Sequence, residues 1–500
     1  MPRAKHGHST ESLPVGKRFR RKSLFIQVFV MSNGPINASN NGVEYLASIA
    51  MGSDCLDVDP RGILCVDGVP ADRLIADFGS PLFVVSESTV RQNVRAARRA
   101  FSVRWPAPVN VMYAIKANNN LAIRAIVHAE GGGGDCFGMG ELYATFQGGA
   151  DPALIAMNGT YKTPQEIDEA VRRGVTINID AEDEVELICV AARKYNVRAQ
   201  VNIRIKVFSD YFRDVGSDYF GVPDHIGVRS SMETAKWGFG IEKAAALTRR
   251  LADLSDVDHA GFHWHFGRFS TRKDAIAELY SALGKTVSEL HERTGFWPRI
   301  LDIGGGIPRE RDPESRQLAM NQLNIDGYAE TVCSALLKGL SHSGLPTPAL
   351  WLEPGRFIVG NASILLTTIG TIKRDLGYSW VNVDSSTNLL MRIDTSDSRY
   401  HIVPASCMRR PFKEGVSIVG LTCIPSVFAR SQDMPGLAAG EILAILDAGM
   451  YSEVTSTQFN GVPRPATVLV NDGHAEVIKT RETIEDVFRL HRIPERLLAN

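Results

Sequence analysis

Short apolar runs alternate with amphipathic segments between residues 82 and 357, and this alternation restricts the possible folds more than any other feature of the chain. The candidate strands are residues 81–86, 109–117, 153–159, 175–180, 199–205, 259–267, 298–306 and 349–356. Apolar residues three and four apart predict helices between them, at 88–101, 164–173, 181–195, 243–254 and 273–294. Eight such alternations favour a closed TIM-like (β/α)8 barrel over an open doubly wound sheet.

The chain on either side of this region is β-rich. Strand patterns follow at 363–373, 380–386, 415–421, 441–449, 465–473 and 474–480, and a hairpin-like stretch lies at 55–71. We therefore predict a β domain formed by residues 52–81 and 358–500, next to a barrel of residues 82–357. Residues 1–51 are predicted to be a disordered extension. A basic stretch and a short apolar run there resemble a secretory signal, but a polar Asn/Gly/Ser stretch follows instead of a small-residue cleavage site.

Composition disfavours several classes of protein. The net charge of −1 disfavours a nucleic-acid binder, and no apolar run approaches the roughly 20 residues that span a bilayer. Seven scattered cysteines, without a CxxC pair or zinc-type spacing, are typical of reduced thiols in the cytoplasm. These features predict a cytoplasmic protein whose partners are small molecules or a second copy of the chain, with no nucleic acid and no membrane.

Lys116 stands at the end of an apolar run, VMYAIKANNN, where a cation has no evident structural use. At the mouth of a barrel such a lysine is partly desolvated, which lowers its pKa and makes it a nucleophile towards aldehydes. For Lys116 alone, a surface lysine with a buried stem is the simpler interpretation.

Two glycine-containing turns follow later strands. Gly304, Gly305 and Gly306 in DIGGGIP allow the backbone to approach a ligand and turn its N–H groups towards an anion. EPGR places Glu353 and Arg356 on one turn, where the guanidinium suits a phosphate or carboxylate and the carboxylate can hold a proton on a pyridine-type nitrogen. Each turn alone is also compatible with a tight loop or a surface ion pair.

His263 and His265 lie two residues apart in HWHF, on one face of a strand. No third ligand stands at a spacing that suits zinc, so no metal site is predicted. An imidazole stacked on a cofactor ring would use His265 without a metal.

The order of the motifs resembles the fold-type III pyridoxal-phosphate (PLP) decarboxylases, the ornithine/diaminopimelate decarboxylase family, and is most similar to the diaminopimelate decarboxylase branch. The resemblance covers residues 54–490. It is carried by YAIKAN, DCFGMGEL, NGTYKT, KWGFG, GFHWHFG, DIGGGIP, EPGR, GLTC and DAGMYSEVTSTQFNGVPRP. It implies a PLP-binding TIM-like barrel completed by a C-terminal β domain, and an enzyme that removes the α-carboxylate of an amino acid.

The resemblance also implies how PLP is held. Lys116 would carry it as a Schiff base, and Glu353 would pair with its pyridine nitrogen. His265 would stack on the ring, Tyr451 would bind the phosphate, and Arg356 would contact phosphate or a substrate carboxylate. The other positions implied around the cofactor are Asp135, Glu141, Gly304, Gly305 and Gly306.

Cys423 corresponds to the thiol that, in this family, reaches into the active site of the partner subunit. The resemblance implies that it returns a proton after CO₂ leaves, so a homodimer with shared active sites is expected.

The chain departs from the family pattern around the substrate. Ile424 follows Cys423 where the family carries a motif with an acidic residue for a distal ammonium, and Ser396 replaces a tyrosine in a motif that keeps Arg392. Arg268 stands where a serine is usual. Because a buried ammonium beside Ile424 would be unpaired, these changes favour a substrate that carries additional carboxylates.

Several functions stay open. The substrate could be meso-diaminopimelate, as in lysine biosynthesis, or a carboxylate-rich conjugate such as the citryl-diaminopropionate intermediate of siderophore assembly. A racemase of the alanine racemase type shares the barrel and the lysine, and a non-catalytic regulator could keep the fold. The EPGR, triple-glycine and Cys423 motifs favour a decarboxylase.

Overall fold

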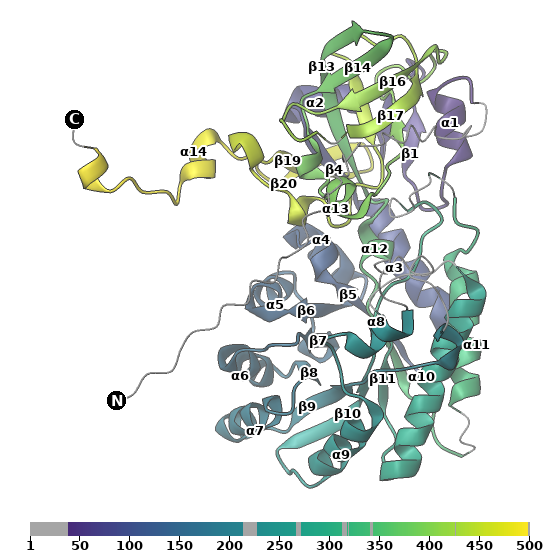
Figure 1. The fold of residues 1–500 in the computed structure, drawn as a ribbon, viewed down its shortest axis with the longest axis vertical. Helices are drawn as coiled ribbons and strands as arrows, with labels where there is room; N and C mark the ends of the chain where they lie inside the picture. Colours follow the sequence, from purple (N-terminus) through teal and green to yellow (C-terminus); the bar gives the residue numbers. More distant parts are fainter. Residues whose placement is uncertain are drawn as a thin grey trace, which may run out of the picture.

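The computed structural model describes residues 39–213, 228–266, 272–312, 318, 320–340, 344–425 and 427–498. Figure 1 shows a barrel with outer helices in the lower part of the molecule and a β-rich part above it. In the described part of the chain, no helix is both long enough and apolar enough to cross a bilayer.

Eight parallel strands close the barrel, which confirms the predicted architecture. They run in the order β10-β11-β12-β5-β6-β7-β8-β9. Their bounds are β5 Val109–Ala114, β6 Gly133–Phe137, β7 Ile155–Asn158, β8 Thr176–Ile179, β9 Ala199–Arg204, β10 Val257–His263, β11 Ile300–Asp302 and β12 Ala349–Leu352.

One predicted barrel strand belongs elsewhere. Residues 82–86 form β4 (Leu82–Ser86), which pairs with strands of the upper sheet, so the prediction that the barrel includes this segment is wrong. The eighth barrel strand is β6, which the sequence did not reveal because GGGGDCF has no apolar run. A Cβ on Gly133 would overlap the carbonyl oxygen of Leu154, so the glycine that hides the strand also permits its pairing with β7.

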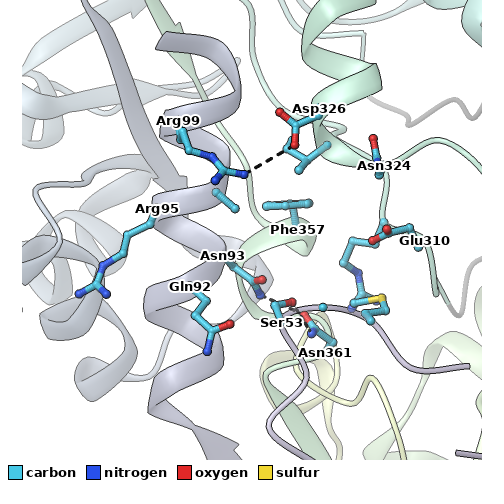
Figure 2. A pocket seen from close by; sticks show the side chains of 15 residues that line it. Ser53, Gln92, Asn93, Arg95, Arg99, Glu310, Asn324, Asp326, Phe357 and Asn361 are labelled. Atoms are coloured by element: carbon cyan, nitrogen blue, oxygen red, sulfur yellow. Dashed lines mark hydrogen bonds and ion pairs between the residues drawn. The ribbon is translucent and has the colours of Figure 1, made fainter. Parts of the chain in front are cut away.

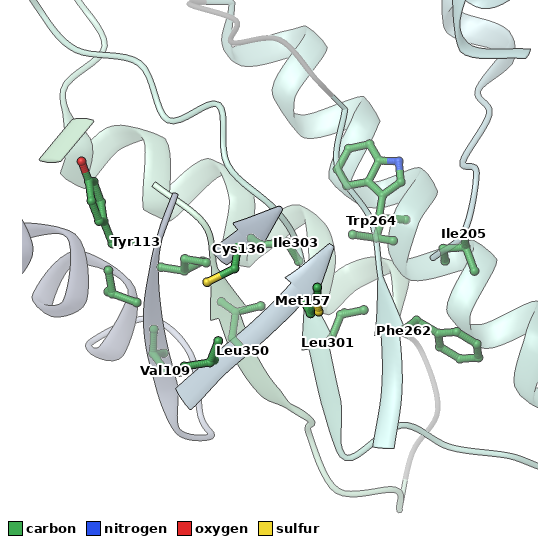
Figure 3. Packing of buried hydrophobic residues seen from close by; sticks show 14 of the residues in the cluster. Val109, Tyr113, Cys136, Met157, Ile205, Phe262, Trp264, Leu301, Ile303 and Leu350 are labelled. Atoms are coloured by element: carbon green, nitrogen blue, oxygen red, sulfur yellow. The ribbon is translucent and has the colours of Figure 1, made fainter. Parts of the chain in front are cut away.

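Helices cover the outside of the barrel. They are α3 Glu87–Ser102, α4 Leu121–Ala129, α5 Gly138–Gln147, α6 Pro164–Arg173, α7 Glu184–Tyr195, α8 Val228–Thr234, α9 Ile241–Ala252, α10 Lys273–Thr294, α11 Ile325–Gly339 and α12 Arg356–Val359. Local sequence sets their ends: in α6, Thr163 and Glu166 form a capping box and Gly174 ends the helix in the left-handed region, with φ 75°. Figure 3 shows the apolar packing around the strands, including Met157, Leu301 and Leu350, which belong to the largest buried cluster.

The upper part is a mixed sheet in the order β17-β16-β14-β13-β4-β19-β20, to which β15 and β18 pair. Its later strands are β13 Ser363–Asp375, β14 Tyr378–Val383, β15 Ile402–Val403, β16 Glu414–Val419, β17 Val427–Met434, β18 Ile442–Ile445, β19 Ala466–Asn471 and β20 His474–Lys479. A small sheet of β1 Leu56–Val58, β2 Leu64–Val66 and β3 Val69–Pro70 shares an apolar core with it, through Leu64, Val84 and Ile364. The short helices are α2 Ala71–Phe78, α13 Arg392–Ser396 and α14 Ile484–Phe488.

The stretch before residue 52 is not entirely the disordered extension predicted. Helix α1 (Gly42–Ser48) begins at Asn41, whose side chain accepts hydrogen bonds from two backbone N–H groups. Tyr45 is buried and its hydroxyl lies 2.7 Å from Nδ1 of His401, in the upper part of the molecule. The prediction is therefore wrong for residues 42–51, because two helical turns are too short to show a clear period. Residues 1–38 lie outside the described part of the chain.

A buried ion-pair network joins the two parts of the molecule. The guanidinium of Arg311, which follows the triple-glycine turn, donates to Asp447 at 2.7 Å and to Asp54 at 2.7 Å. Arg309 donates to the other carboxylate oxygen of Asp447 at 3.1 Å. Removing one partner of such a network leaves an uncompensated buried charge, so it fixes the barrel rim against the upper part.

Candidate active site

Lys116 lies in the short turn that follows β5, at the barrel mouth. Its Nζ donates to Oδ2 of Asp135 at 2.5 Å and lies 4.8 Å from the centre of the Phe137 ring. The Lys116 side chain is 35% exposed, whereas Asp135 on β6 is fully buried. Burial alone would lower the pKa of the Lys116 ammonium, but the charges of Asp135 and Glu353 outweigh it and raise the pKa. The lowered pKa predicted from the sequence is therefore wrong for this state of the site.

Glu353 follows β12 and shares a hydrogen-bonding partner with Asp135. The Asn158 side-chain amide, at the end of β7, donates to Asp135 Oδ1 at 2.7 Å and to Glu353 Oε1 at 2.7 Å. Burial raises the pKa of Asp135, and the charge of Glu353 raises it further. The structure thus brings three predicted residues, Lys116, Asp135 and Glu353, into one cluster.

Further buried polar side chains surround Glu353. His263 Nε2 lies 3.5 Å from Glu353 Oε1, and ligand atoms of His263, Asp302 and Glu353 all lie within 4.8 Å of one another. Burial raises the pKa of Asp302 well above its ordinary range, and the charge of Glu353 raises this pKa further. Burial lowers the pKa of His263 well below its ordinary range. Sequence reasoning missed Asp302 and Asn158, although both are polar residues at the end of an apolar run.

His265 packs against the triple-glycine turn. Its Nδ1 accepts a hydrogen bond from the backbone N–H of Gly305 at 3.0 Å, so Nδ1 carries no proton. Burial lowers the pKa of His265 to about 3, and the ring is neutral at physiological pH. A Cβ on Gly304 would collide with His265, and one on Gly305 would overlap the carbonyl oxygen of Glu353. Gly304 and Gly306 have φ of 67° and 89°, a region that favours glycine.

Tyr451 joins this cluster from the upper part of the molecule. Its backbone N–H donates to the carbonyl oxygen of Ala117, next to Lys116, at 2.8 Å. The guanidinium of Arg392 lies 5.1 Å from the centre of the Tyr451 ring. Arg392 is the first residue of α13 and Ser396 is the last, and Ser396 is exposed.

Glu141 and Arg356 each lie in the first turn of a helix. Glu141, in the first turn of α5, accepts from the backbone N–H of Phe137 at 2.6 Å, and burial raises the pKa of its carboxyl. Arg356 is the first residue of α12, and its Nη1 lies 3.7 Å from Asp312 Oδ2.

Two predicted residues lie on a loop of the upper part, and one lies outside the described residues. Cys423 is exposed after β16, and its backbone N–H donates to Asn460 Oδ1 at 3.2 Å. Ile424 next to it is half-buried. Arg268 falls in residues 267–271, outside the described part of the chain.

A cavity of about 590 Å³ lies away from this cluster (Figure 2). It is lined by α3, by the start of α11 and by residues near Ser53, with Arg99 of α3 at 3.7 Å from Asp326 of α11. Of the predicted site residues that the structure describes, none lines it. The barrel mouth, rather than this cavity, gathers the reactive groups.

The residues at the mouth fit PLP. An amine stands beside a buried carboxylate, a neutral imidazole lies beside a glycine turn, and Glu353 is available to a ring nitrogen. Both ring nitrogens of His263 and Oδ2 of Asp302 are buried without a hydrogen-bond partner in the described part of the chain. Unpaired buried polar atoms are typical of sites that hold a ligand or water.

Comparisons with known proteins agree with this chemistry. Residues 87–360 match the family model of the pyridoxal binding domain of pyridoxal-dependent decarboxylases. The diaminopimelate decarboxylase of Methanothermobacter thermautotrophicus is 33% identical over 89% of this chain and 99% of its own length. The diaminopimelate decarboxylase of Archaeoglobus fulgidus is 31% identical over 87% of this chain and 99% of its own length.

Solved structures give the same result. A crystal structure of diaminopimelate decarboxylase from Methanocaldococcus jannaschii matches with a TM-score of 0.80 and 28% identity, over 89% of this chain and 99% of that one. A second structure of that enzyme, in co-complex with L-lysine, matches with a TM-score of 0.78 and 28% identity, over 90% of this chain and 100% of that one. The chain therefore belongs to the pyridoxal-dependent decarboxylases, as a PLP-dependent carboxy-lyase similar to diaminopimelate decarboxylase.

Proposed function

We propose that the enzyme removes the α-carboxylate of an amino acid whose distal end also carries a carboxylate, with meso-diaminopimelate as the first candidate. The position of Arg392 carries this proposal, because its guanidinium lies over Tyr451, which is held against the residue next to Lys116. A guanidinium at that place suits a carboxylate, whereas Ile424 offers no charge to a distal ammonium. The related enzyme in co-complex with L-lysine supports the proposal, since L-lysine is what meso-diaminopimelate becomes on losing CO₂.

Each residue at the mouth has a proposed role. Lys116 would hold the cofactor through its aldehyde, and Asp135 orients the Lys116 amine and pairs with its charge. Glu353 would pair with the ring nitrogen and keep it protonated, and neutral His265 would pack against the ring. When bound, PLP supplies the electron sink for the charge left by the departing carboxylate.

A second group of residues surrounds the phosphate and the substrate. The N–H groups of Gly304 and Gly305 donate to Asp302 and His265, so in the Gly304–Gly306 turn the N–H of Gly306 would hold the phosphate, together with the Tyr451 hydroxyl. Arg356 would contact phosphate or a substrate carboxylate. Glu141 keeps the Phe137 backbone in place beside the amine of Lys116.

A substrate panel tests the substrate class. CO₂ release should be fastest with meso-diaminopimelate or with citrate conjugates of diaminopropionate. The kcat/KM for lysine, ornithine or arginine should be at least about tenfold lower, because an unpaired charge at a binding site costs more free energy than a tenfold change in kcat/KM. Preference for the citrate conjugates would place the enzyme in carboxylate siderophore chemistry. Efficient turnover of lysine or ornithine alone would contradict the proposal.

We further propose an active homodimer in which Cys423 serves the site of the other subunit. The exposure of Cys423, on a loop of the upper part rather than in the Lys116 cluster, supports this arrangement. Its thiol would return the proton to Cα after CO₂ leaves. All seven cysteines are free in the structure, which supports a reducing compartment, and we propose the cytoplasm.

Mixing two inactive variants tests the shared site. Cys423→Ala should lower kcat by about 10²-fold, as expected for loss of a general acid. After subunit exchange with Lys116→Ala, about a quarter of the wild-type activity should return, because half of the dimers are mixed and each has one intact site. Cys407→Ala, at a buried cysteine outside the site, is the control. It should be active alone, and its mixture with Lys116→Ala should keep about half of the wild-type activity before and after subunit exchange, with no gain on exchange. No return of activity with the Cys423→Ala mixture would contradict a shared site.

A further inference from the structure

Three asparagines stand in line across neighbouring barrel strands. Asn158 ends β7, Asn178 lies on β8 and Asn202 lies on β9, and the register pairs Asn178 directly with Asn202. All three are at most 2% exposed. Barrel interiors are usually filled by branched apolar side chains, so a row of buried amides needs another explanation.

The amides form a ladder with one direction. Asn202 donates to Asn178 Oδ1 at 2.9 Å, and Asn178 donates to Asn158 Oδ1 at 3.0 Å. Asn158 then donates to Asp135 at 2.7 Å and to Glu353 at 2.7 Å. Every NH₂ group therefore points along the row towards the two carboxylates.

The Asn178 donor on one side and the two carboxylate acceptors on the other determine which atom of Asn158 meets the carboxylates. The oxygen and nitrogen of an amide are nearly the same size, so Asn158 could turn over without a steric clash. A turned amide would place its oxygen against both carboxylates, and its NH₂ against the NH₂ of Asn178. The Asn178 donor prevents this, and the Asn202 donor fixes Asn178 in the same way.

We propose that Asn178 and Asn202 are positioning residues, which hold the Asn158 amide with its NH₂ between Asp135 and Glu353. The proposal rests on the roles proposed above for these two carboxylates. A single NH₂ group between them offsets their mutual repulsion, and the hydrogen bond from Asn158 favours the ionised form of Asp135. The ladder thus sets the geometry and charge of Asp135, which orients Lys116, and of Glu353, which is proposed to pair with the ring nitrogen. It acts on Lys116 and on the cofactor through these two carboxylates.

Asn178→Leu tests the ladder, because leucine fills a similar volume and makes no hydrogen bond. We expect kcat to fall by about tenfold or more with KM within about twofold, since the damage is to positioning rather than to substrate binding. The acid limb of the pH titration of cofactor absorbance should move to higher pH, because a weaker hydrogen bond from Asn158 raises the pKa of Asp135 further. PLP affinity, measured by fluorescence in the cofactor-depleted protein, should fall in parallel.

Thr176→Val is the matched control. Thr176 is buried on the same strand and accepts a hydrogen bond from Gln200 of β9 at 2.6 Å, but it does not join the ladder. This variant should lose a similar amount of thermal stability and leave the pH titration unchanged. If Asn178→Leu does not fold, Asn202→Leu, at the end of the row, should shift the titration in the same direction by a smaller amount. A titration of Asn202→Leu that superimposes on that of Thr176→Val would overturn the proposal.

Glu353→Gln separates failure of the ladder from failure of the proposed site. If Glu353→Gln changes the titration and the asparagine variants do not, the ladder has no positioning role and the site stands. If Glu353→Gln leaves the titration unchanged as well, the proposed role of Glu353 is wrong and the ladder proposal falls with it.

Discussion

Replacing Lys116 by alanine is expected to lower kcat by at least about 10³-fold, because removal of a nucleophile that acts as one unit with its partners removes most of the catalysis. The variant should bind PLP without a covalent bond, so borohydride should attach no cofactor mass to the chain. Intact-protein mass spectrometry after borohydride treatment and a CO₂-release assay measure the two effects. Among the residues that the structure describes, Asp135 would keep the Asn158 amide as its hydrogen-bond partner, so a lower melting temperature is also expected.

Lys116→Arg separates the charge of Lys116 from its chemistry. A guanidinium can still pair with Asp135, so this variant should keep the melting temperature closer to that of the wild type than alanine does. It cannot form a Schiff base, and its activity should be as low as that of the alanine variant. Activity within tenfold of wild type in either variant would contradict the role of Lys116 as the cofactor anchor.

Glu353→Gln is expected to lower kcat by about 10²–10³-fold, the usual loss when one preorganised electrostatic partner of a reacting group is removed. A neutral amide cannot hold a proton on the ring nitrogen, and the ring then accepts charge poorly. Cofactor attachment should persist, because Lys116 and the Gly304–Gly306 turn are unchanged. Steady-state kinetics and the absorbance of the bound cofactor measure both effects.

Asp302→Asn is the matched control for Glu353→Gln. Asp302 is buried in the same layer, and its raised pKa favours a neutral carboxyl there already. Asparagine at this position can still accept the hydrogen bond that Asp302 receives from Gly304 at 2.9 Å. We expect the kcat of Asp302→Asn to stay within about tenfold of wild type. A loss as large as that of Glu353→Gln would show that catalysis does not depend on the charge of Glu353 in particular.

Much of the barrel could be predicted from the sequence, because patterns within a few residues determine where its helices and most of its strands form. The bounds of α6 and α10 coincide with the predicted 164–173 and 273–294, since capping residues and apolar spacing act within a few residues. The motifs around Lys116, the triple glycine and Glu353 fall at strand ends, and parallel strands bring their carboxyl ends to one rim of a barrel. That rim brings Lys116 to Asp135 and His265 to Gly305, two contacts that were not themselves predicted from the sequence.

Other features could not be predicted, because they depend on which strands pair with each other and on contacts between distant residues. Residues 82–86 have the same local pattern as a barrel strand, and only pairing with β13 and β19 places them in the upper sheet. The glycines of β6 leave this strand without an apolar pattern in the sequence, but they allow a neighbouring strand to approach closely. Helix α1 is stabilised by contacts such as that of Tyr45 with His401, which is far away in the sequence.

The sequence by itself determined seven of the eight barrel strands, the order of the motifs and the identity of the reactive groups, because these depend on residue type and short spacing. The tertiary structure alone decided the partners of those groups. Asn158, Asn178 and Asn202 lie on three strands and are separated by 20 and 24 residues in the sequence, and nothing local to any one of them predicts that the three amides align. The charge state of Lys116 was decided in the same way, because a carboxylate from another strand outweighs the burial that the sequence suggested.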